Sequence, residues 1–187
     1  MAVDLYRVFS HRLGAANHEP GGALFIPPQG LGRIDNPQHY QVLYVSTEPE
    51  AAVAESFGAR PSQTWTAKML RGHPLIPGSV RALAHYELAD WSEVCDLDDP
   101  RRLLEQKLRP SQVITRDYWL TQEWALRIYQ QRARWVGLRW WSFYEGRWSS
   151  LGLWDRARLV LRNVVPLDLR HPALLGAAAR IGRQVAE

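Results

Sequence analysis

The chain has 187 residues, of which 46% are hydrophobic, and a formal net charge of +4, which together predict one domain with a substantial hydrophobic core. That charge is too small to indicate direct nucleic-acid binding, and the single cysteine, Cys95, excludes an intramolecular disulfide and a cysteine-based zinc site. No apolar run approaches the ~18 residues of a membrane span and the N-terminus has no signal-peptide pattern, so we expect a soluble, cytoplasmic protein.

The chain begins with a predicted strand and a long irregular segment. Residues 4–9, DLYRVF, have the composition of a strand. Residues 11–39 are rich in Gly and Pro and show neither helical nor strand periodicity. Loops of this length are usually functional or disordered.

A strand and a short helix follow. Residues Val42–Ser46 form a run of β-branched and aromatic side chains that predicts a buried strand. Thr47 and Glu50 have the spacing of a capping box, and Gly58 marks a helix end. The sequence therefore predicts a short helix with its apolar body at residues 51–57.

The middle of the chain predicts one strand and two helices. Residues 81–88 alternate in the manner of a strand. Asp99 followed by Pro100 predicts a helix start. A second helix is expected to begin near Thr121 and to continue to Trp135.

Strand-like segments return after Gly137 and precede a last helix that opens at Pro172 and runs to the C-terminus. Early strands, inserted helices and late strands predict a single α/β (α+β) domain over residues 1–187, with a mixed central β-sheet flanked by helices. The expected inward face of the last helix carries Leu174, Leu175, Ala178, Ile181 and Val185.

Glu55 is an isolated carboxylate in the predicted apolar helix, which contains no cation. One interpretation is a surface or ion-paired glutamate, the usual situation of this residue. The other is a carboxylate held in a cleft to stabilise positive charge or to bind a hydroxyl group. Strand–helix units tend to place ligands at the carboxyl end of the strand, so Arg33, Tyr44 and Glu55 could converge on one crevice.

Short motifs in a fixed order give the chain a resemblance to the RES domain, a family named for its Arg, Glu and Ser. The early motifs are Tyr6-Arg7, Gly32-Arg33 followed by Asn36-Pro37, Leu43-Tyr44 and Ala54-Glu55. The late motifs are Asp96-Leu97, Asp99-Pro100, Thr121-Gln122, the GLRWWS run that ends at Ser142, and Leu153-Trp154-Asp155. The resemblance covers about residues 5–165. The loop that carries Arg33 is one residue longer than the family's and lacks its aromatic residue, and Trp141 stands where Pro is common.

RES proteins are the toxin halves of bacterial toxin–antitoxin pairs, their fold resembles that of ADP-ribosyltransferases, and they destroy NAD⁺ by hydrolysis or phosphorolysis. The resemblance therefore implies an enzyme that cleaves the nicotinamide–ribose bond, with NAD⁺ as a consumed substrate and no cofactor. It also implies an Xre-type antitoxin as partner. Whether water or inorganic phosphate is the co-substrate, and whether the protein forms a homo-oligomer, are left open.

The resemblance also implies a role for each matching side chain. Arg33 would hold the pyrophosphate with a bidentate fork, and Tyr44 would lie beside the nicotinamide. Glu55 would bind ribose hydroxyls and stabilise an oxocarbenium-like transition state. Ser142 would hydrogen-bond to the ribose or a phosphate. A further matching pair on the first strand, expected to contribute to binding, is Tyr6 and Arg7.

Two other functions are compatible with the same residues or fold, and a metal site is the remaining alternative. An ADP-ribosyltransferase that modifies a macromolecule would use the same pocket with another acceptor. A catalytically silent binding module is disfavoured by the presence of Arg33, Tyr44, Glu55 and Ser142. The histidines are scattered without metal-binding spacing, so no metal site is expected.

Overall fold

A computed structural model describes residues 2–131, 135–155 and 157–186 of the chain. Its main feature is a seven-stranded mixed sheet, in which only the pairing of β5 with β6 is parallel. In spatial order its strands are β5 (Val94–Asp96), β6 (Gly137–Trp141), β7 (Ser149–Trp154), β2 (Val42–Ser46), β1 (Val3–His11), β4 (Val80–Leu88) and β8 (Leu159–Pro166).

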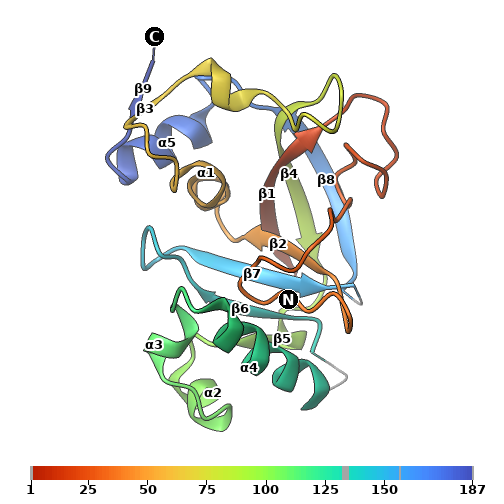
Figure 1. Cartoon of the computed structure of the whole chain (residues 1–187), viewed down its shortest axis with the longest axis vertical. Coiled ribbons are helices and arrows are strands. Elements are labelled where there is room, and N and C mark those ends of the chain that lie inside the picture. Colours follow the sequence, from red (N-terminus) through yellow and green to blue (C-terminus); the bar gives the residue numbers. More distant parts are fainter. Residues whose placement is uncertain (1, 132–134, 156, 187) are drawn as a thin grey trace.

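The sheet divides into two halves where β1 meets β2. These two strands share the single registered pair Tyr6–Ser46, whereas β1 pairs with β4 along its whole length. Figure 1 shows the consequence: β1, β4 and β8 run at a steep angle to β2 and β7. The edge of β1 beyond Tyr6 is therefore not covered by β2, which leaves room for a cleft.

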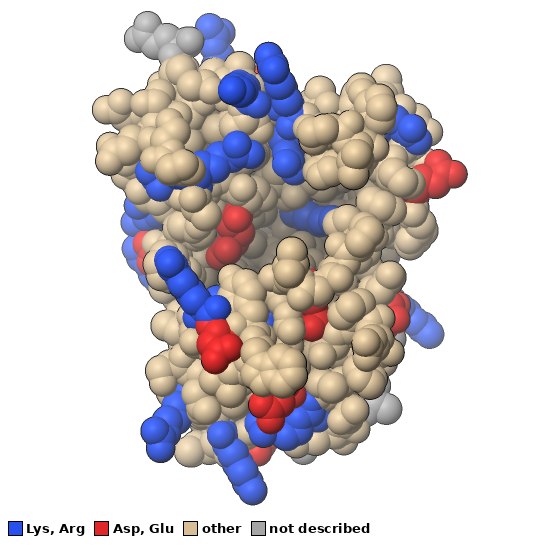
Figure 2. All heavy atoms as spheres, viewed as in Figure 1, with Lys and Arg blue, Asp and Glu red and all other residues tan. Residues whose placement is uncertain are grey.

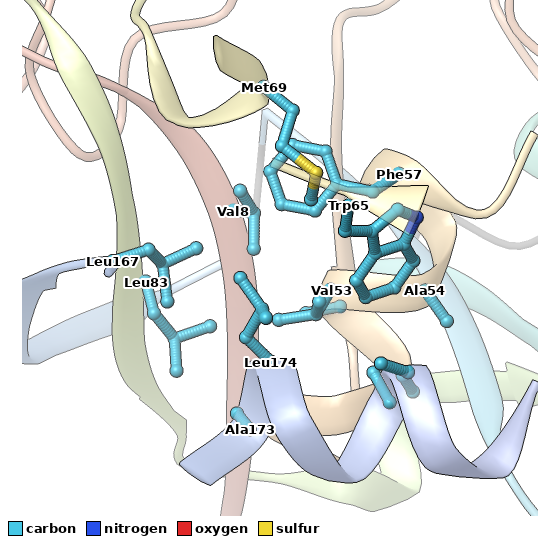
Figure 3. Packing of buried hydrophobic residues seen from close by; sticks show 14 of the residues in the cluster. Val8, Val53, Ala54, Phe57, Trp65, Met69, Leu83, Leu167, Ala173 and Leu174 are labelled. Atoms are coloured by element: carbon cyan, nitrogen blue, oxygen red, sulfur yellow. The ribbon is translucent and has the colours of Figure 1, made fainter. Parts of the chain in front are cut away.

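Two helices cover the half that contains β1 and β4. These are α1 (Pro49–Phe57) and α5 (Pro172–Arg180), and they pack against each other and against the sheet (Figure 1). Figure 3 shows Phe57 and Ala54 of α1 beside Trp65, with Leu174 of α5 close to Val53. Burial of these apolar side chains is the main stabilisation of α1, because the nine-residue helix is too short to be stable alone.

The other half of the sheet carries the three remaining α-helices, α2 (Pro100–Glu105), α3 (Pro110–Val113) and α4 (Tyr118–Gln131). Their apolar side chains form a second core with β6 and β7, which includes Trp124, Leu138 and Trp154. The irregular segment before β2 covers a third core, to which it contributes Ala23, Leu24 and Ile26.

Most predicted elements are confirmed, with shifted boundaries. The predicted strands at residues 4–9, 42–46 and 81–88 correspond to β1, β2 and β4. Asp99 is the N-cap of α2, and its side chain accepts a hydrogen bond from the backbone N–H of Arg101. The mixed sheet flanked by helices confirms the predicted fold class.

Local predictions were wrong in three elements, α1, α4 and α5. The N-cap of α1 is Glu48 and has no side-chain cap bond, so Thr47 and Glu50 form no capping box. Helix α4 begins at Tyr118 rather than near Thr121, and Trp135 is not helical; residues 132–134 lie outside the described residues.

The last helix ends at Arg180 rather than at the C-terminus. Gly182 follows with a φ of +68°, a left-handed conformation that Gly adopts without strain and that turns the chain. Residues Gln184–Val185 then form β9, which pairs in parallel with β3 (Thr64–Trp65). Val185 is therefore not part of the helical face, and Leu175 on α5 is 45% exposed.

The remaining elements are two short 3₁₀ helices, η1 (Ala67–Leu70) and η2 (Trp91–Glu93). Within the described residues, no helix has both the length and the apolar character needed to cross a membrane.

Candidate active site

A cleft of about 400 Å³ lies where the two halves of the sheet separate. Of the six side chains predicted for the site, five line this cleft: Tyr6, Arg7, Arg33, Tyr44 and Glu55. Figure 2 shows a hollow near the middle of this face, with acidic atoms on one side and basic atoms on the other. The predicted convergence of Arg33, Tyr44 and Glu55 on one crevice is therefore observed.

Glu55 projects from the side of α1 that is not buried in the core. Its neighbours Ala51 and Ala54 are fully buried, while Glu55 itself is exposed and lines the cleft. Its Oε1 accepts two hydrogen bonds, from Ser142 Oγ at 2.6 Å and from Ser150 Oγ at 3.0 Å. Its Oε2 has no hydrogen-bond partner among the described residues and stays available to a ligand.

Ser142 holds Glu55 but is not among the residues that line the cleft. It is only 3% exposed, and its Oγ also accepts a hydrogen bond from the backbone N–H of Tyr144 at 3.2 Å. The structure therefore places Ser142 behind the carboxylate, where it orients Glu55. This position differs from the expected contact with the ribose or a phosphate.

Ser150 is a site residue that the sequence analysis missed. It lies on β7 opposite Ser46 of β2, lines the cleft and donates to the same oxygen of Glu55 as Ser142 does. No sequence motif marked it, because its role depends on the register of two strands. A weak signal was available in the alternation of β7, which turns Ser149 and Ser150 to opposite faces.

Arg33 lines the cleft from the loop before β2, whereas Glu55 lines it from α1. Its Nη1 donates to the backbone carbonyls of Val113 and Thr115, both at 2.7 Å, and its guanidinium carbon lies 5.4 Å from the centroid of the Tyr118 ring. Burial lowers the pKa of Arg33, and the nearby Tyr118 and Glu55 oppose that change. Among the described residues, Arg33 and Glu55 form no direct ion pair, although both line the cleft.

The loop that carries Arg33 is organised by Asp35. The Asp35 carboxylate is buried and accepts hydrogen bonds from the backbone N–H groups of Gly30 at 2.9 Å and Gly32 at 2.7 Å. It also accepts one from the Tyr44 hydroxyl at 2.6 Å, and that hydroxyl accepts one from the Ile34 N–H. Burial, and next the bond to Asp35, raise the pKa of Tyr44 above its ordinary value, so the hydroxyl stays protonated as a donor.

Gly32 has a steric role in the same loop. A Cβ atom there would lie 2.6 Å from both Asp35 Oδ1 and the Tyr44 hydroxyl. Because such contacts are too close for any side chain, only glycine permits this packing. Tyr44 thus lines the cleft as predicted, and its hydroxyl fixes the loop.

Helix α4 holds the loop from the other side. The Thr121 hydroxyl donates to the carbonyl of Arg33, and Gln122 Nε2 donates to the carbonyl of Gly32 at 2.8 Å. Asn36 Nδ2 in turn donates to the carbonyl of Gln122 at 3.0 Å. The Thr121-Gln122 motif therefore has a structural explanation: it fixes the position of Arg33.

Tyr6 and Arg7 of β1 line the cleft and also have structural partners. The Tyr6 ring stacks on His85 with the ring centroids 5.0 Å apart. Arg7 Nη1 donates to the carbonyls of Ala23 at 3.2 Å and Phe25 at 3.0 Å. Arg7 therefore anchors the irregular segment to β1, and this role accounts for its partial burial.

The described residues contain no group of three or more His, Cys, Asp or Glu side chains that could hold a metal ion.

The sequence model of the RES domain matches residues 4–178, and the chain therefore belongs to the RES domain family. This confirms the resemblance drawn from the motifs and extends it beyond residue 165. No curated protein matches the chain.

In fold, the chain is similar to a chain of the crystal structure of the M. tuberculosis MbcT–MbcA toxin–antitoxin complex. The TM-score is 0.60 at 18% sequence identity, over 89% of this chain and 85% of that chain. At this identity the similarity is one of fold.

Proposed function

We propose that the protein degrades NAD⁺ by cleaving the bond between nicotinamide and ribose. The observation that carries this proposal is the Glu55 carboxylate, which two serine hydroxyls hold through Oε1 while Oε2 remains unpaired among the described residues. A carboxylate fixed in this way is preorganised to bind ribose hydroxyls and to stabilise a developing positive charge.

Arg33 supplies a positive charge to the cleft that Glu55 lines. Because its Nη1 is occupied by two carbonyls, its remaining N–H groups are the ones free to bind the pyrophosphate. Tyr6 and Tyr44 line the same cleft and supply aromatic surface suited to the nicotinamide ring.

The proposed reaction needs little acid catalysis, because the pyridinium ring of NAD⁺ leaves as neutral nicotinamide with the electrons of the broken C–N bond. The positive charge then resides on the ribose, where Glu55 stabilises it. Attack by water with loss of a proton gives ADP-ribose. Attack by inorganic phosphate instead gives ADP-ribose 1″-phosphate. A macromolecular acceptor in the same position would instead make the protein an ADP-ribosyltransferase.

The primary test is NAD⁺ turnover by purified protein, followed by NMR or mass spectrometry with and without millimolar phosphate. We expect nicotinamide release, and the second product identifies the nucleophile. Glu55→Gln should lower kcat by about 10²- to 10³-fold while the protein remains folded, since the change removes the charge and keeps the shape. A folded Glu55→Gln variant with full activity would contradict the assignment of the site.

A toxin role in a toxin–antitoxin pair is the second part of the proposal. Membership in the RES family and the fold likeness to a chain of a toxin–antitoxin complex support it. Expression of the wild-type chain should arrest bacterial growth with loss of cellular NAD⁺, Glu55→Gln should not, and co-expression of an Xre-type antitoxin from a neighbouring gene should restore growth. Growth arrest by both the wild-type chain and Glu55→Gln would mean that the toxicity does not depend on the proposed chemistry.

A further inference from the structure

A second cavity, of about 320 Å³, lies beside the candidate active site along the part of β1 that β2 leaves uncovered. The two share Arg7 and Val8 as lining residues, so they are neighbours on the same strand. Most of the second cavity's wall is apolar and includes Phe9, Phe25 and Ile76. No acidic residue lines it.

Arg81 is the unusual residue in this wall. It stands on β4 opposite Ser10 of β1, and its side chain is half-buried. Its Nε is fully buried and has no hydrogen-bond acceptor among the described residues. A buried N–H without an acceptor is costly, and a guanidinium group makes that cost larger. The cavity wall offers Arg81 no carboxylate as a partner.

The surroundings of Arg81 favour an anion as that partner. Burial is the main effect that lowers the pKa of Arg81, and the positive charge of Arg60 is the second. No carboxylate opposes these two effects. The side chain is therefore a cation beside another cation, in a wall without acids. An anion bound at the part of the guanidinium group that faces the cavity would relieve this repulsion.

A second donor faces the same space. His73 lines the cavity, and its Nδ1 accepts a hydrogen bond from the backbone N–H of Leu75 at 3.2 Å. In the neutral ring, Nε2 therefore carries the proton and is a donor. Arg7 contributes charge, but its Nη1 is occupied by the carbonyls of Ala23 and Phe25.

We propose that this cavity binds a phosphate group through Arg81, with His73 as a second donor. Two sources share this chemistry. The first is the nucleotide half of a dinucleotide that extends from the neighbouring cleft, and this source rests on the proposed function; the aromatic and aliphatic walls suit its base. The second is free inorganic phosphate. The need of Arg81 for an anionic partner is independent of the proposed function.

The test is isothermal titration calorimetry of the full chain with three probes: inorganic phosphate, AMP and ADP-ribose. Arg81→Gln removes the charge, and Arg170→Gln is the matched control, because Arg170 is exposed and lines neither space. We expect at least about tenfold weaker binding to Arg81→Gln and no change in Arg170→Gln. If Arg81→Gln loses affinity only for AMP and ADP-ribose, the site binds the phosphate of a nucleotide. If it also loses affinity for inorganic phosphate, the site binds the free anion.

Two results would overturn the proposal: equal affinity of wild type and Arg81→Gln for every probe, or no binding of any probe to folded wild type at millimolar concentration. If Arg81→Gln does not fold, the assigned Nε–Hε resonance of Arg81 in ¹⁵N-labelled wild type replaces it. That resonance should shift when the probes are added, and an unchanged resonance at saturation counts against the site.

These titrations need no turnover, so they fail independently of the proposed function. Binding that depends on Arg81 in a protein that leaves NAD⁺ intact would retain the anion site and refute the enzyme. NAD⁺ cleavage by a protein whose binding of the probes does not depend on Arg81 would support the enzyme and refute the anion site.

Discussion

The two walls of the cleft are built by different physical means. Glu55 stands on α1, a helix held by apolar burial against β1 and α5. Arg33 stands on a loop without helix or strand. Hydrogen bonds hold this loop: Asp35 accepts them, and Tyr44, Thr121 and Gln122 donate them. Apolar packing tolerates small adjustments, whereas a buried polar network fails when one partner is lost. Changes to the two walls should therefore have different consequences, and the following variants test that difference.

The largest effect on stability is expected from Phe57→Ala, which removes a buried apolar side chain that holds α1 in place. Phe57 is 1% exposed, with its ring 6.0 Å from the Trp65 ring. Its removal should lower the free energy of unfolding by about 3–5 kcal/mol, measured by urea denaturation. Leu175→Ala on α5 is the control; it is 45% exposed and should change stability by about 0.5 kcal/mol or less. Similar losses in both variants would mean that this core does not stabilise α1.

Asp35→Asn tests the polar wall and should have an intermediate effect. Gly30 and Gly32 donate to Oδ2 of Asp35, and Tyr44 donates to Oδ1. The amide has NH₂ in place of one of these oxygens, so one side of the network loses its acceptor. We expect a loss of about 1–3 kcal/mol in the free energy of unfolding, and a KM for NAD⁺ that rises more than kcat falls, because Arg33 is displaced.

The control for Asp35→Asn is Asp98→Asn. Asp98 is exposed and lies 3.1 Å from Arg139, and such surface ion pairs contribute about 0–1 kcal/mol. If Asp35→Asn lowered kcat alone and left both KM and stability unchanged, the loop would not depend on this carboxylate.

Ser150→Ala should have the smallest effect and tests how Glu55 is oriented. It removes one of the two hydrogen bonds to Oε1 and should lower kcat by about tenfold, with little change in stability. Ser142→Ala should cost more stability, since it also leaves the N–H of Tyr144 without that acceptor.

Ser149→Ala is the matched control for Ser150→Ala. The neighbouring Ser149 Oγ accepts from Arg139 Nε at 2.9 Å and does not line the cleft. Its removal should leave kcat unchanged. An equal loss of activity in the Ser149 and Ser150 variants would show that the effect arises from β7 and not from the contact with Glu55.

Local sequence signals predicted the elements that are determined by residues close together in the chain. The β-branched run of β2 and the Asp99-Pro100 start of α2 were confirmed. Predictions failed where tertiary contacts compete with local signals. Thr47 was predicted to start a helix, but its backbone N–H donates to the carbonyl of Ser149 on β7. The C-terminal residues leave α5 because Gln184 and Val185 pair with β3.

The sequence by itself determined the family, the strand β2 and helix α1 that carry Tyr44 and Glu55, and the candidate residues for both walls. These follow from short-range signals and from motifs a few residues long. Only the tertiary structure decided which side chains hold the charges in place. Ser150 lies 95 residues from Glu55 in the chain, and Val113 lies 80 residues from Arg33. Contacts of this kind depend on strand register and helix packing, which no local pattern of residues specifies.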